Sequence, residues 1–419
     1  MTLKCEFLII GDELLEGRLN DSNGPLLASW AFREGLKLER MTFVSDQETL
    51  LEAAIKEALS RADLVLTSGG LGPTADDRTK QVLAKIIKKP LTDSSSAREI
   101  VTGHYARLKR AWTDSTNQYH LIPESAIPLF NPEGLAPGLL WQTPTQSLLM
   151  FPGVPREFAS MLDTHIMPEI KRLAPNLQRK TSLTIRTIGV AEETLFNKIA
   201  PNLWEDLEQF GKLSSLPQTM GLDLVLTPQK DEDFLDWSQI VRNYVEQSPL
   251  KKFLWQYGER SLGDYLIDLL TVKNQTIAFA ESCTGGLVSS MITDLSGASR
   301  IFKGSIVCYD NEIKTSLLKV APKTISDFGA VSEACVQEMA IGARELLKTD
   351  YALSLSGIAG PTGGSAQKPV GTLALGWAGP LGVGSELLHF HGERKQLKQR
   401  FALKALFKLR ELVTESPQV

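Results

Sequence analysis

Short apolar runs alternate with segments in which apolar residues recur every three to four positions over residues 1–170. Short runs are typical of buried strands, and the longer spacing is typical of helices that bury one face. Strands are predicted at 7–10, 41–45, 63–67 and 147–151, and helices around 26–31 and 50–60. This alternation predicts an α/β domain with a mostly parallel sheet covered on both faces.

The stretch 171–257 differs in texture, with prolines between its predicted elements. Strands are expected at 182–188 and 222–226, and helices near 191–200 and 233–247. The pattern indicates a small α+β module. We expect it to act as a spacer or a dimerising element.

From residue 258 the α/β pattern returns. Strands are predicted at 276–280, 304–309, 351–355, 370–377 and 385–390, and a basic amphipathic helix from about residue 393 closes the chain. The sequence therefore predicts an α/β protein of three parts, residues 1–170, 171–257 and 258–419.

The composition of the chain argues against several classes of function and site. The formal charge is −4, and no basic stripe is evident, which argues against direct contact with nucleic acid. Four cysteines and five histidines show no metal-ligand spacing, so neither a zinc site nor a disulfide framework is expected. No apolar run approaches the ~18 residues needed to span a bilayer. We expect a cytoplasmic protein with no membrane partner.

A serine-containing turn is the first candidate for chemistry. An apolar strand at 276–280 is followed by Ser282, Thr284, Gly285 and Gly286, and then by a helix. Backbone N–H groups at the helix start are expected to face the same space, where they could bind an anion or an oxyanion. An ordinary capped strand-to-helix turn is the alternative.

A serine nucleophile needs a base within reach. His389 and His391 alternate on a predicted strand, but a half-buried pair with ordinary partners is the simpler interpretation. Lys314, one turn into a helix that follows a strand, is the next candidate, since desolvation favours the neutral amine. Cys283 is the rival nucleophile, and we interpret it as a packed small residue because no cation is evident to form its thiolate.

A glycine-rich segment follows the strand at 63–67. Its backbone N–H groups can cradle phosphate, and the candidate phosphate-binding residues are Ser68, Gly69, Gly70, Gly72 and Thr79. A similar pattern, Ser-Gly-x-x-Gly-Pro-Thr, recurs at 356–362 and indicates a second nest of this kind.

Three carboxylates accompany the first glycine segment. Asp76 and Asp77 lie beside it, and Asp46 follows another strand end. Hard oxygen ligands of this kind suit Mg²⁺ bridging phosphates. A solvated acidic helix start is the alternative interpretation of Asp76 and Asp77.

Taken together, these motifs resemble the CinA family over essentially the whole chain. The resemblance rests on residues 11–17 with Asn23, 69–79, 131–138, 152–155, 280–286, 309–314 and 356–361. It implies a three-layer αβα N-terminal domain similar to molybdopterin-binding proteins, and a C-terminal α/β domain similar to nicotinamide mononucleotide (NMN) deamidase. The family usually has Ser or Thr where Asp310 stands, which puts an extra carboxylate beside Tyr309.

For the C-terminal domain the resemblance implies amide hydrolysis of NMN to nicotinic acid mononucleotide and ammonia, without a cofactor. Ser282 would be the nucleophile, Lys314 the base and Tyr309 an assisting group. Backbone N–H groups near residues 284–286 would hold the oxyanion. The substrate would be bound by Thr284, Gly285, Gly286, Asn311, Gly357, Gly360 and Arg394.

For the N-terminal domain the resemblance implies hydrolysis of ADP-ribose with a divalent ion (Mg, Mn or Co) at Asp46, Asp76 and Asp77. A pterin-related role is the alternative there, and a non-catalytic partner protein in competence or DNA repair is the alternative for the whole chain. A homodimer is expected from the resemblance alone.

Overall fold

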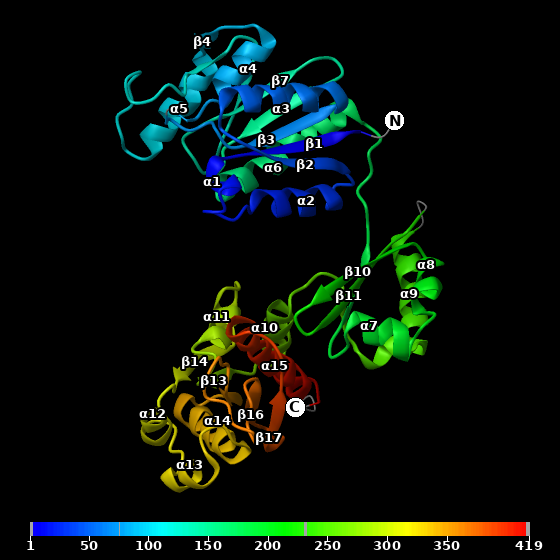
Figure 1. Cartoon of the computed structure of the whole chain (residues 1–419), viewed down its shortest axis with the longest axis vertical. Helices are drawn as coiled ribbons and strands as arrows, with labels where there is room; N and C mark the ends of the chain where they lie inside the picture. The colour runs from blue at the N-terminus through cyan, green and yellow to red at the C-terminus, as the bar shows by residue number, and fades with distance from the viewer. Residues whose placement is uncertain (1–2, 75, 230–232, 416–419) are drawn as a thin grey trace. The chain divides into compact units, whose positions relative to one another are not determined.

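The computed structural model describes residues 3–74, 76–229 and 233–415. It groups the chain into two compact units, residues 1–181 (unit 1) and 182–419 (unit 2) (Figure 1). Within the described ranges, no helix is both long enough and apolar enough to cross a membrane.

Unit 1 is built on a six-stranded sheet in which parallel pairs precede antiparallel ones. In sheet order the strands are β2 (Leu38–Val44), β1 (Cys5–Ile10), β3 (Leu64–Ser68), β8 (Ser147–Phe151), β7 (Gly138–Gln142) and β6 (Ile127–Leu129). The pairs from β2 to β8 are parallel, and β7 and β6 pair antiparallel. A separate two-stranded ladder joins β4 (Leu91–Asp93) to β5 (Leu121–Pro123). The mostly parallel α/β sheet predicted for this part is confirmed.

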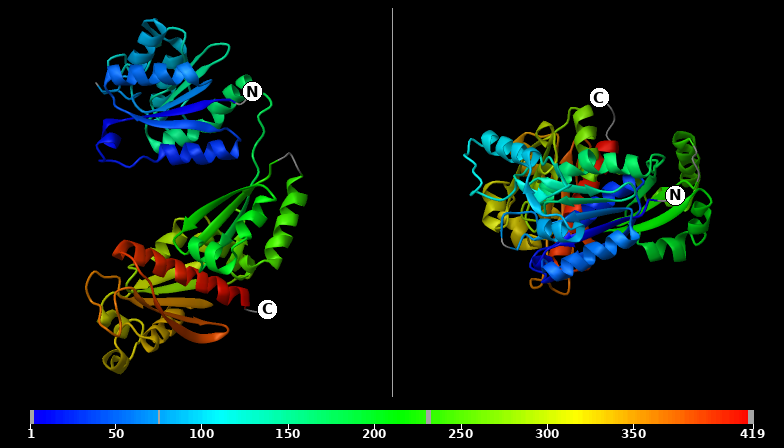
Figure 2. Two further views of the ribbon diagram at one scale, coloured as in Figure 1. Left: turned by 45° about the vertical axis from the view of Figure 1, so that its right-hand side comes forward. Right: turned by 90° about the horizontal axis from the view of Figure 1, so that it is seen from above.

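Helices cover both faces of this sheet, as Figures 1 and 2 show. The helices of unit 1 are α1 (Asp12–Leu15), α2 (Asn23–Arg33), α3 (Glu48–Arg61), α4 (Thr79–Ile87), α5 (Ser95–Arg107) and α6 (Pro155–Leu173). Alternate residues of β1 face opposite cores: Phe7 packs with α2 and α6, whereas Leu8 packs with α3, α4 and α5. The result is a three-layer αβα domain.

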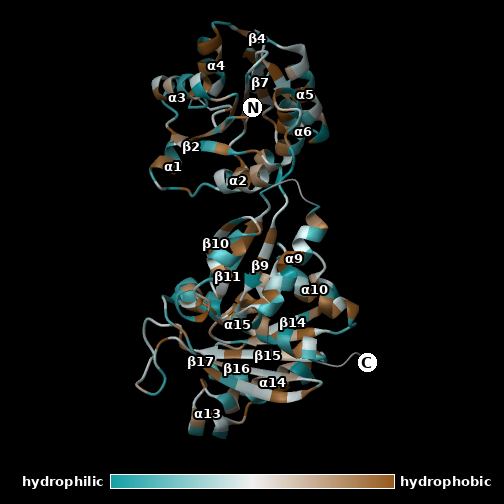
Figure 3. Cartoon of the chain, turned by 90° about the vertical axis from the view of Figure 1, so that its right-hand side faces the viewer, coloured by the Kyte–Doolittle hydropathy of each residue, from teal (hydrophilic) through white to brown (hydrophobic). Residues whose placement is uncertain are grey.

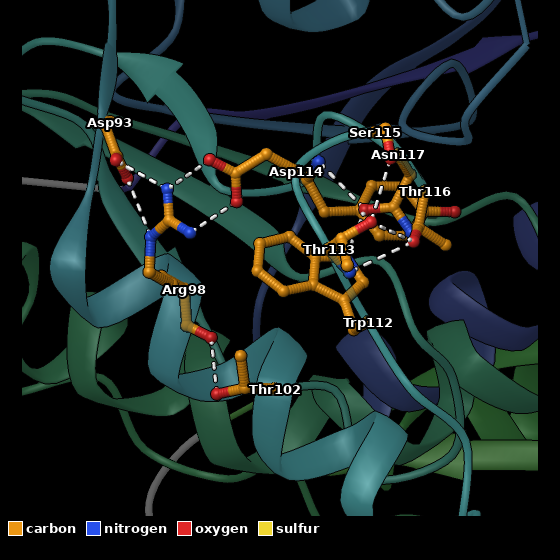
Figure 4. Close-up of polar contacts among 10 residues, drawn as sticks. Asp93, Arg98, Thr102, Trp112, Thr113, Asp114, Ser115, Thr116 and Asn117 are labelled. Carbon is orange, nitrogen blue, oxygen red and sulfur yellow. Dashed lines mark hydrogen bonds and ion pairs between the residues drawn. The ribbon is translucent and has the colours of Figure 1, made fainter.

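Arg98 of α5 anchors the long segment that follows this helix (Figure 4). Its guanidinium donates to Asp93, 2.6 Å away, and to Asp114, 2.5 Å away. It also lies 5.3 Å from the ring centre of Trp112. These contacts tie the segment to β4, and the segment continues to Tyr119 at the candidate site below.

Unit 2 contains two sheets. The first is antiparallel, in the order β10 (Lys212–Gln218), β11 (Gly221–Thr227), β9 (Leu183–Thr187) and β12 (Leu254–Tyr257). Its helical elements are α7 (Glu192–Thr194), the π-helical turn η1 (Leu195–Ile199), α8 (Leu203–Glu208), α9 (Phe234–Gln247) and the 3₁₀ turn η2 (Pro249–Lys252). This is the predicted α+β module.

The second sheet of unit 2 has the order β14 (Phe302–Val307), β13 (Ile277–Glu281), β15 (Tyr351–Gly357), β16 (Thr372–Gly379) and β17 (Gly382–His389). The first three strands are parallel, and the last two are antiparallel. Its helices are α10 (Leu262–Val272), α11 (Leu287–Thr293), η3 (Ala298–Arg300), α12 (Asn311–Ser316), α13 (Pro322–Phe328), α14 (Glu333–Leu347) and α15 (Arg394–Glu415). One face packs on α10, α11 and α15, and the other packs on α14. Hydrophilic and hydrophobic residues alternate along such helices in Figure 3, which fits helices that bury one face only.

The three predicted parts become two units for a packing reason. Ile188, Met220 and Trp255 of the α+β module pack against the core formed by α10, α11 and α15. The module therefore shares a core with the C-terminal sheet. At the other boundary, α6 runs to Leu173, three residues beyond the predicted end at residue 170.

Candidate active sites

The serine turn, residues 282–286, leaves the carboxyl end of β13. The Ser282 N–H donates to the Leu355 carbonyl on β15, 2.9 Å away, which extends the sheet by one residue. Gly285 and Gly286 have φ of 63° and 96°, a region that side chains disfavour. The two glycines reverse the direction of the chain shortly after Ser282. Ser282 itself is 9% exposed.

A buried carboxylate fills the start of α11. Glu281, which is fully buried, accepts hydrogen bonds from the N–H groups of Gly286 (2.9 Å), Val288 (3.1 Å) and Ser289 (3.0 Å). The Ser289 hydroxyl also donates to it, at 2.6 Å. The prediction that the N–H of Gly286 and the helix start would hold an oxyanion is therefore wrong, because an internal anion already occupies them.

The burial of Thr284 and of Cys283 decides two further predictions about this turn. Thr284 is fully buried and its hydroxyl has no partner among the described residues, so it does not present that group to a substrate. Cys283 is 6% exposed, and burial raises the pKa of its thiol to about 12. The expectation of a packed small residue at Cys283 is confirmed, since the thiol stays protonated.

Lys314 is a buried amine on α12. It is 1% exposed, and its Nζ donates to the carbonyls of Cys308 (2.8 Å) and Tyr309 (3.3 Å). Among the described residues no carboxylate lies within 4.0 Å of it. The N–H of Cys308 donates to the carbonyl of Glu281, 2.9 Å away. Because the Lys314 amine contacts Cys308, it lies close to the end of the strand that precedes Ser282.

The departure from the family at Asp310 has a local role. Its carboxylate accepts the N–H of Glu312 at 2.7 Å and so caps α12. Ser and Thr cap helices in the same way, which explains why Asp is accommodated here.

Arg394 contacts two other residues that were predicted to belong to the site. It donates to the Gly360 carbonyl at 2.7 Å and to the Tyr309 hydroxyl at 3.3 Å. Tyr309 itself is 63% exposed. Three segments far apart in the sequence thus meet at the carboxyl edge of the sheet.

The remaining predicted residues of unit 2 separate into packing and surface positions. A Cβ on Gly357 would lie 2.7 Å from the Thr372 carbonyl and 3.2 Å from the Cys283 sulfur, so this glycine permits close packing. Asn311 is exposed at the first turn of α12. His389 and His391 are exposed, with ring centres 4.7 Å apart, so the expected half-burial of this pair is wrong.

Lys398 is a residue that the sequence analysis missed. A Cβ placed on Gly285 would lie 3.8 Å from its Nζ, so the amine of α15 reaches the serine turn. Its position four residues after Arg394 was the available signal, since residues at that spacing share a helix face.

In unit 1 the predicted loops surround a cleft of about 810 Å³. The lining includes most of the predicted residues, namely Asp46, Ser68, Gly69, Gly70, Gly72, Asp76 and Asp77. Other polar residues reach it too, among them Glu13, Asp21, Tyr119, Glu133 and Glu157. The carboxyl ends of parallel strands form this edge, where open α/β sheets commonly bind ligands.

Hydrogen bonds from Asn23 and Thr79 hold the glycine loop, residues 68–74, in place. Asn23 donates to the Ser68 hydroxyl at 2.6 Å and to the Gly153 carbonyl at 2.8 Å. Thr79 is fully buried and its hydroxyl donates to the Gly69 carbonyl at 3.1 Å. Thr79 does not line the cleft, so its predicted contact with phosphate is replaced by a role in bracing the loop.

The three predicted metal ligands do not act as a set. Asp77 turns back to accept the N–H of Thr74 at 2.9 Å. Burial raises the pKa of Asp46, and the charges of Asp12, Glu13 and Asp76 add to this. Over residues 3–74, 76–229 and 233–415, no group of three His, Cys, Asp or Glu side chains is placed to hold a metal ion. The expected three-carboxylate set is therefore not formed, although Asp46 and Asp76 share a strongly negative cleft.

The fold and these sites define an α/β protein with a molybdopterin-binding-like N-terminal domain and a second α/β domain that carries a serine turn. A family model described as "Probable molybdopterin binding domain" matches residues 6–172, and one described as "CinA C-terminal domain" matches residues 259–413. The chain belongs to the CinA family, as the resemblance of its motifs predicted.

Two CinA-like relatives match nearly the whole chain. A CinA-like protein of Chlorobium phaeovibrioides is 35% identical over 428 residues, which cover 99% of each chain. One from Fervidobacterium nodosum is 34% identical over 97% of this chain and 98% of its own. The crystal structure of competence/damage inducible protein CihA from Agrobacterium tumefaciens is 34% identical and covers 36% of this chain and 93% of that one, with a TM-score of 0.36.

Proposed function

We propose that unit 2 hydrolyses the carboxamide of NMN to nicotinic acid mononucleotide and ammonia, with Ser282 as nucleophile and Lys314 as base. The observation that carries the proposal is the buried Lys314 amine beside the serine turn, with no carboxylate within 4.0 Å among the described residues. A lysine without a counter-charge in a dry environment is suited to proton transfer.

The contacts of Lys314 favour this role. A neutral amine has two N–H bonds, and the carbonyls of Cys308 and Tyr309 can accept both. Its lone pair would then point away from these carbonyls and could accept the proton of Ser282. Cys283 does not compete as nucleophile, because burial keeps its thiol protonated.

The reaction then has two halves. The Ser282 oxygen attacks the amide carbon while its proton passes to Lys314. The C–N bond breaks as Lys314 returns that proton to the leaving nitrogen, which departs as ammonia. Water next attacks the ester, Lys314 takes its proton, and the Ser282 oxygen leaves with a proton from Lys314. Tyr309, held by Arg394, would orient the substrate.

Ammonia release from NMN tests the proposal. Ser282→Ala and Lys314→Met should each lower kcat by about 100-fold or more. Cys283→Ala is the matched control from the same turn and should retain most of the activity. Equal rates for the wild type and Ser282→Ala would refute the nucleophile.

For unit 1 we propose hydrolysis of ADP-ribose to AMP and ribose 5-phosphate. The negative cleft fits a divalent cation, since Mg²⁺ commonly uses one or two carboxylates together with substrate phosphates. Asp46 and Asp76 would hold the ion, which would neutralise phosphate charge when bound. The glycine loop would cradle the pyrophosphate with its N–H groups.

A pterin nucleotide is the second candidate ligand for unit 1, because the matching family model is described as a probable molybdopterin binding domain. Turnover separates the candidates. AMP should appear from ADP-ribose only with a divalent metal, and binding of a pterin without any turnover of ADP-ribose would favour the second candidate. Binding without turnover at both units would instead favour a non-catalytic partner protein.

A further inference from the structure

Unit 2 contains a cavity where the α+β module meets the helices of the C-terminal sheet. Its volume is about 420 Å³, which is within the range of small-molecule sites. One wall comes from the four strands of the module, and the other comes from α10, α11 and α15. Among the described residues, the lining includes neither Ser282 nor Lys314 nor Arg394. The cavity is therefore separate from the proposed deamidase site.

Apolar side chains that are only half-buried line this cavity. Met220 comes from the turn between β10 and β11, Met291 from α11 and Leu403 from α15. A ligand with an apolar body would remove their exposed surface from water, which is favourable. Two thioethers in one cavity favour an aromatic body, because methionine sulfur makes favourable contacts with aromatic rings.

The cation in the lining is already engaged within the protein. The Arg186 guanidinium donates to Asp223 at 3.2 Å and to the Arg260 carbonyl at 2.6 Å. It also lies 5.2 Å from the ring centre of Trp255. An anionic ligand would have to compete with these partners, so the cavity is poorly suited to a phosphate or a carboxylate.

Asp294 supplies the charge that is not engaged. Its carboxylate makes no hydrogen bond or ion pair with the other residues that the structure describes. It follows α11 directly, at a helix end where a negative charge is unfavourable and where the last turn carries no basic residue. With Arg186 and Asp223 compensating each other, Asp294 leaves the lining with one net negative charge.

We propose that this cavity binds a small aromatic amine as its ammonium ion. The ring would pack against Met220, Met291 and Leu403, and the ammonium group would pair with Asp294. The proposal goes beyond the two hydrolytic functions and does not depend on them. A ligand held here would contact α11, which follows the serine turn, and α15, which begins at Arg394. The same two helices would then serve both sites of unit 2.

Methyl resonances of methionine locate the ligand in the full-length chain. The protein has eight methionines, and Met220→Leu and Met291→Leu assign the two signals of the cavity. In protein labelled at the methionine methyl groups, 2-phenylethylamine at neutral pH should shift both signals. It should bind at least about tenfold more tightly than 3-phenylpropionate, which carries a similar ring with the opposite charge. The neutral 2-phenylethanol should bind with intermediate affinity.

Asp294→Asn tests the partner of the ammonium group. It should weaken binding of 2-phenylethylamine by about threefold to tenfold, and it should leave binding of 2-phenylethanol within about twofold. Glu345→Gln is the matched control, since it removes an exposed carboxylate from α14 and should leave both affinities unchanged.

Three results would overturn the proposal. The first is that millimolar 2-phenylethylamine leaves the signals of Met220 and Met291 unshifted. The second is that the three probes bind equally, which would indicate an apolar cavity without preference for a cation. The third is that Asp294→Asn and Glu345→Gln have the same effect on the amine, since Asp294 would then not hold it.

Discussion

Replacing Glu281 by Ala is the substitution that most directly tests how the serine turn is held. The variant would remove the acceptor of three backbone N–H groups and of the Ser289 hydroxyl, at distances between 2.6 and 3.1 Å. These groups lie at a buried helix start, so water can replace the carboxylate only in part. A charged hydrogen bond contributes ~1.5–3 kcal/mol, and the bonds share one acceptor, so we expect a loss of about 3–5 kcal/mol from the free energy of unfolding of unit 2.

Two comparisons sharpen the expectation. Glu281→Gln keeps one acceptor oxygen but turns an NH₂ group toward N–H donors, so its loss should be intermediate, about 1–3 kcal/mol. Glu345→Ala removes an exposed carboxylate from α14 and should change the free energy of unfolding by less than about 0.5 kcal/mol.

Urea unfolding followed by circular dichroism gives the magnitude, with separate transitions fitted for the two units. Hydrogen exchange of a peptide covering residues 282–295 reports the local effect, and its amides should exchange faster in Glu281→Ala. A loss below about 1 kcal/mol, together with unchanged exchange in this peptide, would refute the view that Glu281 fixes the turn.

Four further outcomes are expected. Burial lowers the pKa of Lys80 to about 8, below the ~10.4 of an unfolded lysine, so between these values the unfolded state binds more protons. The free energy of unfolding of unit 1 should therefore rise with pH across this window, and urea titrations of Lys80→Met should lack that rise. Chelation of divalent metals should abolish AMP formation from ADP-ribose and leave ammonia release from NMN unchanged. Iodoacetamide should not label Cys283 in the folded chain at pH 7.5, as peptide mass spectrometry would show, because its thiol stays protonated. Asn23→Ala loses the links to Ser68 and Gly153 and should lower the free energy of unfolding of unit 1 by about 1–3 kcal/mol in urea titrations.

The sequence predicted the carboxyl ends of the parallel strands of both α/β parts to within two residues, but it did not predict the short strands β4 to β7. Apolar runs set the strands, and parallel pairing brings their carboxyl ends to one edge, which is why Asp46 and Ser68 line the same cleft. The position of Lys314 beside the serine turn followed from the same rule, because β13 and β14 are parallel neighbours.

Side-chain direction within those loops could not be derived from spacing. Glu281 ends a strand, and a pattern of residues does not show that its carboxylate bends forward onto the next helix. Thr79 and Asp77 likewise look like ligand-binding residues by type, yet they brace the backbone of their own loop. In each case, local hydrogen bonding takes up a polar group that the sequence leaves open.

Packing between segments that are far apart in the sequence could not be predicted either. Trp255 joins the core of the C-terminal sheet although it belongs to the α+β module, and Lys398 meets Gly285 from a helix more than a hundred residues later. Both contacts depend on how α15 lies on the sheet, which periodicity alone does not give.

The central claim, that Ser282 attacks the amide carbon, is tested most directly by acid-quenching the protein during turnover of NMN and mapping covalent adducts by peptide mass spectrometry. The account predicts a nicotinoyl-mononucleotide ester on Ser282 that is absent from Ser282→Ala. An adduct on Cys283, or ammonia release at the wild-type rate by Ser282→Ala, would contradict it.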